Sequence, residues 1–241
     1  YLCIGTGDHN VIAFSGIALD ASSLKPLAAP FEQTHRFYII DLFHAGESKI
    51  NTPESTDLSP SELIEIVKNF IESKEIESFS IWGFSVGARV AMMLYPELKA
   101  HIQEVVLLAP DGIKKNIWYS FATKSLIGTW VFKHACHSEG IRKLLSAMAK
   151  VVMDKKDSKR IALFLQNSDA LQLIYRQWMT YRNIQPTDDE FKALRQHDNV
   201  LILLAARDEF IKGVTPKKVL QKVPNAEVIV IEDSHLFLNQ H

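Results

Sequence analysis

A serine flanked by glycines is the residue of this sequence best placed to do chemistry. Ser85 lies at the centre of Gly83–Gly87, after an apolar run at Phe79–Trp82 and before a helical stretch over 88–94 that Pro96 is expected to end. A tight turn between a strand and a helix lifts a serine hydroxyl clear of a sheet, and the glycines leave room for close backbone contacts. N–H groups at the start of the helix then lie near a developing oxyanion. The pattern predicts a nucleophile; the alternative is a glycine-rich turn whose serine only caps the helix.

Two further residues could activate this serine. Because a serine hydroxyl is a weak nucleophile, it needs a general base and a group that orients the base. The buried-strand pattern of Val200–Asp208 ends in an acid, and that of Val228–His235 ends in a histidine. Side chains just past the carboxyl ends of parallel strands meet at one edge of the sheet. We therefore expect Ser85, Asp208 and His235 to form a catalytic triad, in the chain order Ser, Asp, His.

Other side chains offer competing assignments. Asp111 closes another apolar run and could replace Asp208 as the acid of the triad. His235 could be a structural histidine rather than a base. A metal site is the third alternative, and its candidate ligands would be His134, Cys136 and His137. No further ligands follow them at a convincing spacing, so we expect no metal.

The elements that must position these residues alternate along most of the chain. Short β-rich runs followed by helical patterns predict an α/β protein with a mostly parallel central sheet flanked by helices. One amphipathic helix is expected over 63–71, and its start is marked by Ser59, Pro60 and Glu62, the residues of a capped first turn. Nearly continuous apolarity is typical of strands buried on both faces. The expected strands are Asn10–Phe14, Phe37–Asp41, Phe79–Trp82, Val105–Ala109, Val200–Ala205 and Val228–Glu232.

The strand pattern is absent between about residues 111 and 190, where apolar residues recur at helical spacing. We therefore expect an all-helical insertion at 111–190, with 1–110 and 191–241 forming the other part of the molecule. The insertion has 13 Lys and Arg against 8 Asp and Glu, whereas the rest of the chain has 14 against 20. This excess is interpreted either as solvated helix faces or as attraction of an anionic substrate. Three tryptophans of the segment could be core or could cover an apolar pocket: Trp118, Trp130 and Trp178.

Taken together, these motifs resemble the α/β-hydrolase superfamily, in its serine-hydrolase branch with a helical cap inserted after the sixth strand. Phe14–Ile17 is similar to the oxyanion loop of that family, and Asp41–Ser48 resembles a second family loop. The resemblance implies that the backbone N–H groups of Ile17 and Val86 form an oxyanion hole. It also implies that no cofactor is needed, and that residues 111–190 form the cap of a catalytic core.

The sequence departs from the family pattern at a few positions. Ser15 stands where the family usually has histidine, and His44 and Ala45 replace a Gly-His pair in the second loop. The oxyanion donor is a backbone group, so it can survive the change at position 15. A serine at position 85, rather than an acid, disfavours the branches of the family that use a carboxylate nucleophile.

The resemblance and the predicted triad together favour an enzyme. We expect hydrolysis of a carboxylic ester or related acyl bond of a small, largely apolar substrate, through an acyl-enzyme on Ser85. The same triad could instead serve a C–C bond hydrolase or a cofactor-free perhydrolase. A weakly catalytic small-molecule receptor or binding protein of the hydrolase fold is a further alternative, because the oxyanion loop is altered.

The composition excludes several classes of protein. The 241 residues carry 27 basic and 28 acidic side chains, and 47% of them are hydrophobic. Such a composition is globular rather than disordered or collagenous, and it has no basic excess for general nucleic-acid binding. Two cysteines cannot build a disulfide framework, and no apolar run approaches the length of a membrane span. We therefore expect a cytoplasmic protein with a small-molecule substrate, no nucleic-acid partner and no integral membrane segment.

Overall fold

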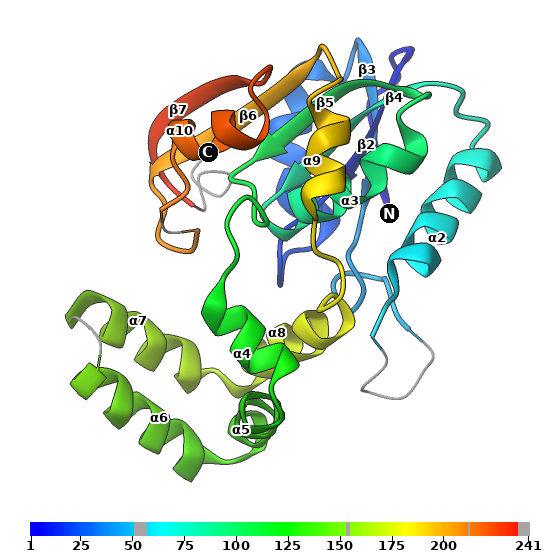
Figure 1. Ribbon diagram of the computed structural model, residues 1–241. Helices are drawn as coiled ribbons and strands as arrows, with labels where there is room; N and C mark the ends of the chain where they lie inside the picture. Colours follow the sequence, from blue (N-terminus) through cyan, green and yellow to red (C-terminus); the bar gives the residue numbers. More distant parts are fainter. Residues whose placement is uncertain (51–56, 153–154, 212, 236–241) are drawn as a thin grey trace. The chain divides into compact units, whose positions relative to one another are not determined.

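A seven-stranded sheet forms the centre of the fold in the computed structural model, which describes residues 1–50, 57–152, 155–211 and 213–235 (Figure 1). The described strands are ordered β1-β3-β2-β4-β5-β6-β7. β1 runs antiparallel to β3, and the other neighbouring pairs in the order are parallel. The strands are β1 (Leu2–Ile4), β2 (His9–Phe14), β3 (His35–Ile40), β4 (Phe79–Phe84), β5 (Ile102–Leu108), β6 (Val200–Arg207) and β7 (Glu227–Ser234).

The predicted fold class is confirmed, and the six expected strands correspond to β2–β7 with small shifts at their ends. The remaining strand, β1, was not expected. It is three residues long and lies at the edge of the sheet with a half-exposed burial pattern, so its apolar run is too short to indicate a strand. Short edge strands of this kind leave little signal in a sequence.

Helix α2 (Pro60–Ser73) begins where the sequence predicts. The Ser59 side chain accepts a hydrogen bond from the Glu62 N–H, and the Glu62 carboxylate accepts one from the Ser59 N–H. This capping box satisfies two N–H groups that would otherwise lack partners at the helix start. Leu63, Val67 and Ile71 form its buried stripe.

The central helix α3 (Val86–Leu98) packs on β2, β4 and β5. Its residues are almost all buried, which explains the continuous apolar run of its sequence. The expectation that Pro96 ends this helix is wrong, because the helix continues to Leu98. A proline this close to the C-terminal end removes only one backbone hydrogen bond, and the turn around it is held by packing.

One face of the sheet carries a compact apolar cluster beneath the segment that follows β2. That segment comprises η1 (Ala21–Leu24), α1 (Lys25–Ala28) and η2 (Ala29–Phe31). Ala21, Leu24 and Ala28 from these short helices pack with buried residues of β2, β3, β4 and β5. The cluster fixes the C-terminal end of β2, from which the predicted oxyanion loop leaves the sheet.

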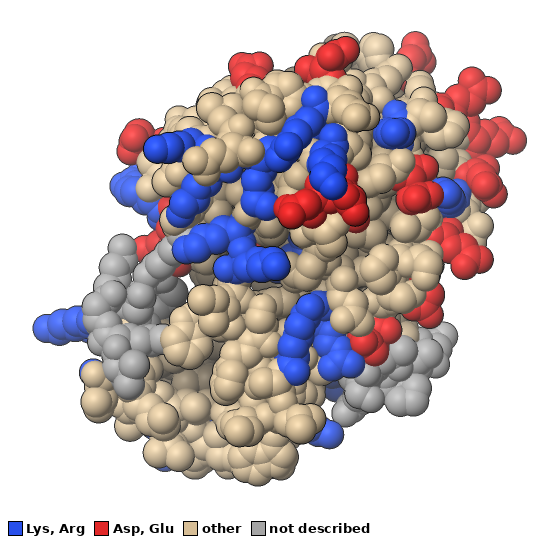
Figure 2. Space-filling model, in the orientation of Figure 1, with Lys and Arg blue, Asp and Glu red and all other residues tan. Residues whose placement is uncertain are grey.

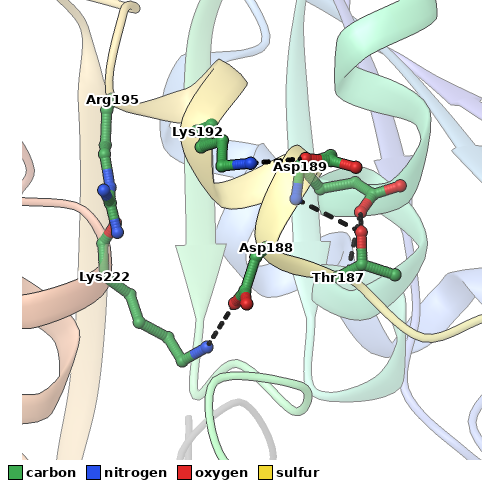
Figure 3. Close-up of polar contacts among 7 residues, drawn as sticks. Thr187, Asp188, Asp189, Lys192, Arg195 and Lys222 are labelled. Atoms are coloured by element: carbon green, nitrogen blue, oxygen red, sulfur yellow. Dashed lines mark hydrogen bonds and ion pairs between the residues drawn. The ribbon is translucent and has the colours of Figure 1, made fainter.

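Helix α9 (Asp188–Leu194) is joined to α10 (Pro216–Lys222) by polar contacts, which Figure 3 shows. Thr187 and Glu190 form a capping box at the start of α9. The Lys222 ammonium lies 3.8 Å from the Asp188 carboxylate, and the Arg195 Nε–H donates to the Lys222 carbonyl at 2.7 Å. Because α9 also packs on α3, these contacts connect the helices around the central strands.

The chain divides into two compact units. Of the described residues, one contains the sheet with 1–50, 58–115, 183–211 and 213–235, and the other contains Asp57, 116–152 and 155–182. The second unit is helical, with a core around Cys136, Leu165 and Leu171. Its helices follow β5, the fifth described strand, and are α4 (Ile117–Lys124), α5 (Leu126–His137), α6 (Glu139–Val152), α7 (Lys155–Gln166) and α8 (Ser168–Thr180).

The helical unit is somewhat smaller than the insertion predicted at 111–190. Asp111 pairs with Arg89 of α3, and α9 packs on α3, so both ends of the predicted segment belong to the sheet-containing unit. The role of the helices as a cap stays a prediction. Within the described ranges, no helix combines the length and the apolarity needed to span a lipid bilayer.

Candidate active site

Ser85 lies at the sharp turn between β4 and α3, where the sequence places a nucleophile. Its backbone has φ +54° and ψ −114°, a conformation that L-residues rarely adopt. Hydrogen bonds hold the turn on both sides: the Ser85 N–H donates to the Leu108 carbonyl at 2.9 Å, and the Asp111 and Ala88 N–H groups each donate to the Ser85 carbonyl at 3.1 Å. Backbone strain of this kind persists only where the surroundings enforce it, and it is often found at functional sites.

The glycines on either side of Ser85 are required by close packing of backbone on backbone. A Cβ atom on Gly87 would lie 2.2 Å from the Phe14 carbonyl oxygen, and one on Gly83 would lie 2.5 Å from the Ala88 Cα atom. Neither contact can be relieved by rotating a side chain. The spacing Gly-x-Ser-x-Gly therefore follows from the geometry of the turn, which brings the start of α3 against the end of β2.

The three predicted triad residues come together in the structure. The His235 Nε2 atom lies 2.9 Å from the Ser85 Oγ atom, and the His235 Nδ1 atom lies 2.6 Å from the Asp208 Oδ2 atom. With its proton on Nδ1, the imidazole donates to the carboxylate and leaves Nε2 to accept the serine proton. Ser85 is 7% exposed and His235 is 5% exposed, so the arrangement is largely shielded from water.

The second oxygen of Asp208 is fixed by the backbone of the loop that follows. Asp208 Oδ1 accepts hydrogen bonds from the N–H groups of Phe210, at 2.9 Å, and Ile211, at 2.7 Å. The carboxylate is thus oriented by its own turn before it meets the imidazole. The aromatic rings of Phe84 and Phe210 lie 5.3 Å and 5.1 Å from the His235 ring and enclose it with apolar surface.

A bulge in β7 brings the acid and the base side by side. The parallel register pairs Ala205 with Ile231 and Arg207 with Ser234, so β7 has one residue more than β6 over this stretch. Asp208 and His235 directly follow these two strands. A β-bulge redirects the side chains that follow it, and here it precedes His235 directly.

Asp111, the alternative acid, makes a different contact. Its carboxylate forms an ion pair with the guanidinium of Arg89, whose side chain is 2% exposed. The geometry therefore favours Asp208 over Asp111 as the partner of His235. Arg89 was not identified as a site residue from the sequence. One signal was available, because Arg89 is the one charged residue in the apolar segment 83–95.

The loop that carries Ile17 lies against the turn that carries Val86. A Cβ atom on Gly87 would also lie 2.6 Å from the Ser15 carbonyl oxygen, and one on Gly16 would lie 3.0 Å from the Phe84 ring. Ser15 itself is fully buried, and its hydroxyl donates to the Leu19 carbonyl at 3.0 Å. Ser15, at the position where the family usually has histidine, thus holds the two ends of its own loop together. The N–H groups of Ile17 and Val86 stay the predicted oxyanion donors.

The second family-like loop is built around Asp41. Its carboxylate accepts a hydrogen bond from the Ala21 N–H at 2.5 Å, which joins it to η1. Gly46 has φ +50°, and a Cβ atom there would lie 2.5 Å from the Asp41 carboxylate. His44 also adopts a positive φ of 70°. These positive φ angles show how the turn forms with His44 and Ala45 in place of the Gly-His pair.

His134 and Cys136 of α5 have structural contacts. The His134 ring stacks on Trp130 with 4.2 Å between ring centroids. Burial raises the pKa of the Cys136 thiol to about 11, so the thiol is protonated at neutral pH. In the described ranges, no three His, Cys, Asp or Glu residues are grouped in a way that could hold a metal ion.

Comparison with known proteins agrees with this geometry. The family model described as alpha/beta hydrolase fold matches residues 10–238. A Mycoplasma pneumoniae protein whose name assigns it provisionally as esterase/lipase 2 is 27% identical over 103 residues, which are 42% of this chain and 38% of that protein. The match thus spans well under half the length of this curated relative.

Three solved structures show the same fold at low sequence identity. A hydrolase from Oleispira antarctica has a TM-score of 0.65 and 13% identity, with 98% of this chain and 88% of that chain covered. A thermophilic esterase from Thermogutta terrifontis has a TM-score of 0.67 and 14% identity, covering 98% and 85%. The thioesterase domain from the curacin biosynthetic pathway has a TM-score of 0.63 and 14% identity, covering 98% and 89%.

Proposed function

The chain belongs to the α/β-hydrolase fold family, and we propose that it is a serine hydrolase which cleaves a carboxylic ester or related acyl bond of a small, largely apolar substrate. One observation carries the proposal: Ser85 Oγ lies 2.9 Å from His235 Nε2, while the opposite ring nitrogen lies 2.6 Å from Asp208. A nucleophile, a base and an orienting acid in that order are what acyl transfer requires. The esterase and thioesterase names among similar proteins agree with this class of bond.

The reaction begins with attack by the Ser85 oxygen on the substrate carbonyl carbon. As the Oγ–carbon bond forms, His235 Nε2 takes the hydroxyl proton, and the carbonyl oxygen becomes an oxyanion. We assign its stabilisation to the N–H groups of Ile17 and Val86, which belong to neighbouring backbone segments. The imidazolium then gives its proton to the leaving alkoxide or thiolate, and an acyl-enzyme remains on Ser85.

Water completes the cycle by the same proton transfers. His235 removes a proton from the water as the water oxygen attacks the acyl carbon, and it returns that proton to Ser85 as the carbon–Oγ bond breaks. Asp208 holds the imidazole with Nε2 facing the serine, because its other oxygen is fixed by the N–H groups of Phe210 and Ile211. The mechanism uses no cofactor or metal.

We also propose that the helices of 111–190 form the cap that is typical of this serine-hydrolase branch. The aromatic residues of the compact unit Asn116–Arg182 favour an apolar substrate. Its basic excess agrees with a substrate that carries a negative end.

A fluorophosphonate probe and a substrate panel test the function. Labelling of the folded protein that disappears in Ser85→Ala supports a serine nucleophile, and no labelling of the folded wild type would overturn the proposal.

The panel compares short acyl esters, long acyl esters, thioesters and vinylogous diketones on wild type and Ser85→Ala. Turnover of an ester or thioester that depends on Ser85 is expected; turnover of the diketones alone would reassign the protein to C–C bond hydrolysis.

A further inference from the structure

The first two helices of the helical unit expose an unusual amount of apolar surface. We call this surface the α4–α5 apolar face. Its residues are Ile117, Trp118 and Phe121 of α4 and Leu126, Ile127 and Trp130 of α5. Leu126 is 91% exposed, Ile117 is 79% exposed and Trp118 is 66% exposed. Clustered exposed apolar residues of this size usually mark an interaction site.

The spacing of these residues gathers them on the outer sides of the two helices. In both α4 and α5 the exposed residues follow the pattern i, i+1, i+4, which is one side of a helix. Opposite them, Tyr119 and Thr123 of α4 and Ala135 and Cys136 of α5 are buried. The helices meet closely, because a Cβ atom on Gly128 would lie 2.1 Å from the Phe121 carbonyl oxygen. The apolar side chains therefore stand on a closely packed helical corner.

The segment that carries the face has charges of a single sign. Residues 112–138 contain four lysines and no Asp or Glu. Lys124 follows Ile117 by seven residues and Lys133 follows Leu126 by seven, so each lysine lies two turns along the same side of its helix. Both lysines are exposed. Figure 2 shows a broad area without charged residues over the helical unit, and α4 and α5 belong to that unit.

We propose that the α4–α5 apolar face docks on the surface of a membrane that contains anionic lipids. Tryptophan and aliphatic side chains enter the boundary between headgroups and acyl chains, while lysines at the edge extend to the anionic headgroups. The face is made of side chains on two helices of 8 and 12 residues, so the association that we propose is peripheral. The proposal concerns binding and goes beyond the hydrolytic activity.

The charges also favour a lipid surface over a second copy of the chain. In a two-fold contact, the same patch meets itself, so Lys124 and Lys133 would face lysines of the other copy with no acid in the segment 112–138 to neutralise them. Repulsion opposes that contact. An anionic bilayer supplies the missing opposite charge, and each lysine near such a surface strengthens binding.

Vesicle flotation with the full chain tests the proposal. Vesicles of phosphatidylcholine alone are compared with vesicles that also contain phosphatidylglycerol, using Ser85→Ala so that lipid hydrolysis cannot alter the result. Binding to the anionic vesicles is expected, with weaker binding at high salt. The double variant Leu126→Ser/Ile127→Ser is expected to lower the partition coefficient at least about tenfold, because two exposed apolar side chains are lost. Lys124→Gln/Lys133→Gln is expected to lower it roughly 30-fold on anionic vesicles.

Matched variants in the sheet-containing unit serve as controls. Leu220→Ser removes an exposed leucine of α10, and Lys25→Gln/Lys217→Gln removes two exposed lysines; neither is expected to change vesicle binding. Equal binding to neutral and anionic vesicles, or binding that survives both variants of the face, would overturn the proposal. Absence of vesicle binding would also overturn it. If, in addition, sedimentation velocity showed a dimer that Leu126→Ser/Ile127→Ser dissociates, the face would be an interface between two copies of the chain instead. None of these readouts depends on hydrolysis, so the membrane proposal and the enzymatic proposal can fail separately.

Discussion

His235 Nε2 lies 2.9 Å from Ser85 Oγ although 150 residues separate the two along the chain. The strands that carry them are not neighbours, because β5 and β6 lie between β4 and β7. With neighbouring strands roughly 4.8 Å apart, β4 and β7 are separated by about 14 Å. The imidazole reaches the serine because the bulge in β7 redirects the chain immediately before His235. A local irregularity of one edge strand thus completes the candidate site.

The two candidate acids are distinguished by exchanging each for its amide. Asp208→Asn is expected to lower kcat on the order of 10⁴-fold, the size of effect known for the acid of serine-protease triads, because the amide no longer favours the Nδ1–H tautomer. Asp111→Asn is expected to change kcat less than about tenfold. It should lower the free energy of unfolding by about 2 kcal/mol, because Arg89 loses the carboxylate beside its buried guanidinium.

Steady-state kinetics and urea unfolding on both variants measure these effects. The expected result is that Asp208→Asn lowers activity, whereas Asp111→Asn lowers the free energy of unfolding. If Asp111→Asn loses activity while remaining as stable as the wild type, Asp111 is the triad acid and the assignment of Asp208 is wrong.

Gly87, two residues after the nucleophile and in the first turn of α3, can be compared with a glycine of another helix. Gly87→Ala is expected to abolish folding or activity, because its Cβ atom would lie 2.2 Å from the Phe14 carbonyl oxygen. Gly140→Ala is the matched control: its Cβ atom would meet only the Ser138 hydroxyl at 3.8 Å, and the residue lies in helix α6. This control is expected to raise the free energy of unfolding by about 0.5–1 kcal/mol. Thermal unfolding and fluorophosphonate labelling measure both; normal labelling of Gly87→Ala would contradict the account of the turn.

The turn at Ser85 was predictable because its constraints are local. A strand, a glycine-flanked serine and a helix are adjacent in the chain, so the pattern of residues 79–94 contains the whole motif. The acid and base could be predicted as strand-end residues because the carboxyl ends of parallel strands meet at one edge. The sheet places Asp208 and His235 there.

Other features depend on contacts between distant segments and could not be predicted from patterns. The bulge that precedes His235 depends on the register between β6 and β7. The nearly continuous apolar runs of these two strands lack the alternation of apolar and polar residues that would mark a register. The pairing of Asp111 with Arg89 connects the end of β5 to the middle of α3. The continuation of α3 beyond Pro96 likewise depends on the packing around that helix. At such positions the tertiary packing overrides the intrinsic helix propensity of the residue.

The two cysteines are expected to react very differently with a thiol reagent. Burial raises the pKa of Cys136 to about 11, and its thiol donates to the Phe132 carbonyl at 3.3 Å inside the core of the helical unit. Cys3 is exposed on β1. Because the thiolate is the reactive form, iodoacetamide at pH 8 is expected to modify Cys3 in the folded protein and both cysteines in urea. Peptide mass mapping reads this directly; modification of Cys136 before unfolding would contradict the packing of α5 against α8.

The stability of the protein in weakly acidic solution is expected to depend on His197. Burial lowers the pKa of His197 below its ordinary value of 6.5, and a hydrogen bond with the Gln103 backbone and the nearby Asp198 carboxylate only partly oppose this. The His197 ring packs on Tyr95, with 5.3 Å between ring centroids. A histidine that resists protonation in the folded state takes up its proton more readily when unfolded, so stability is lost as the pH falls below about 6.5 and levels off below the folded pKa.

His197→Gln is expected to flatten this part of the curve of unfolding free energy against pH. His9→Gln, at an exposed histidine of the same unit, should leave the slope unchanged. Urea unfolding at a series of pH values measures both, and equal slopes for wild type and His197→Gln would show that His197 is not the responsible group.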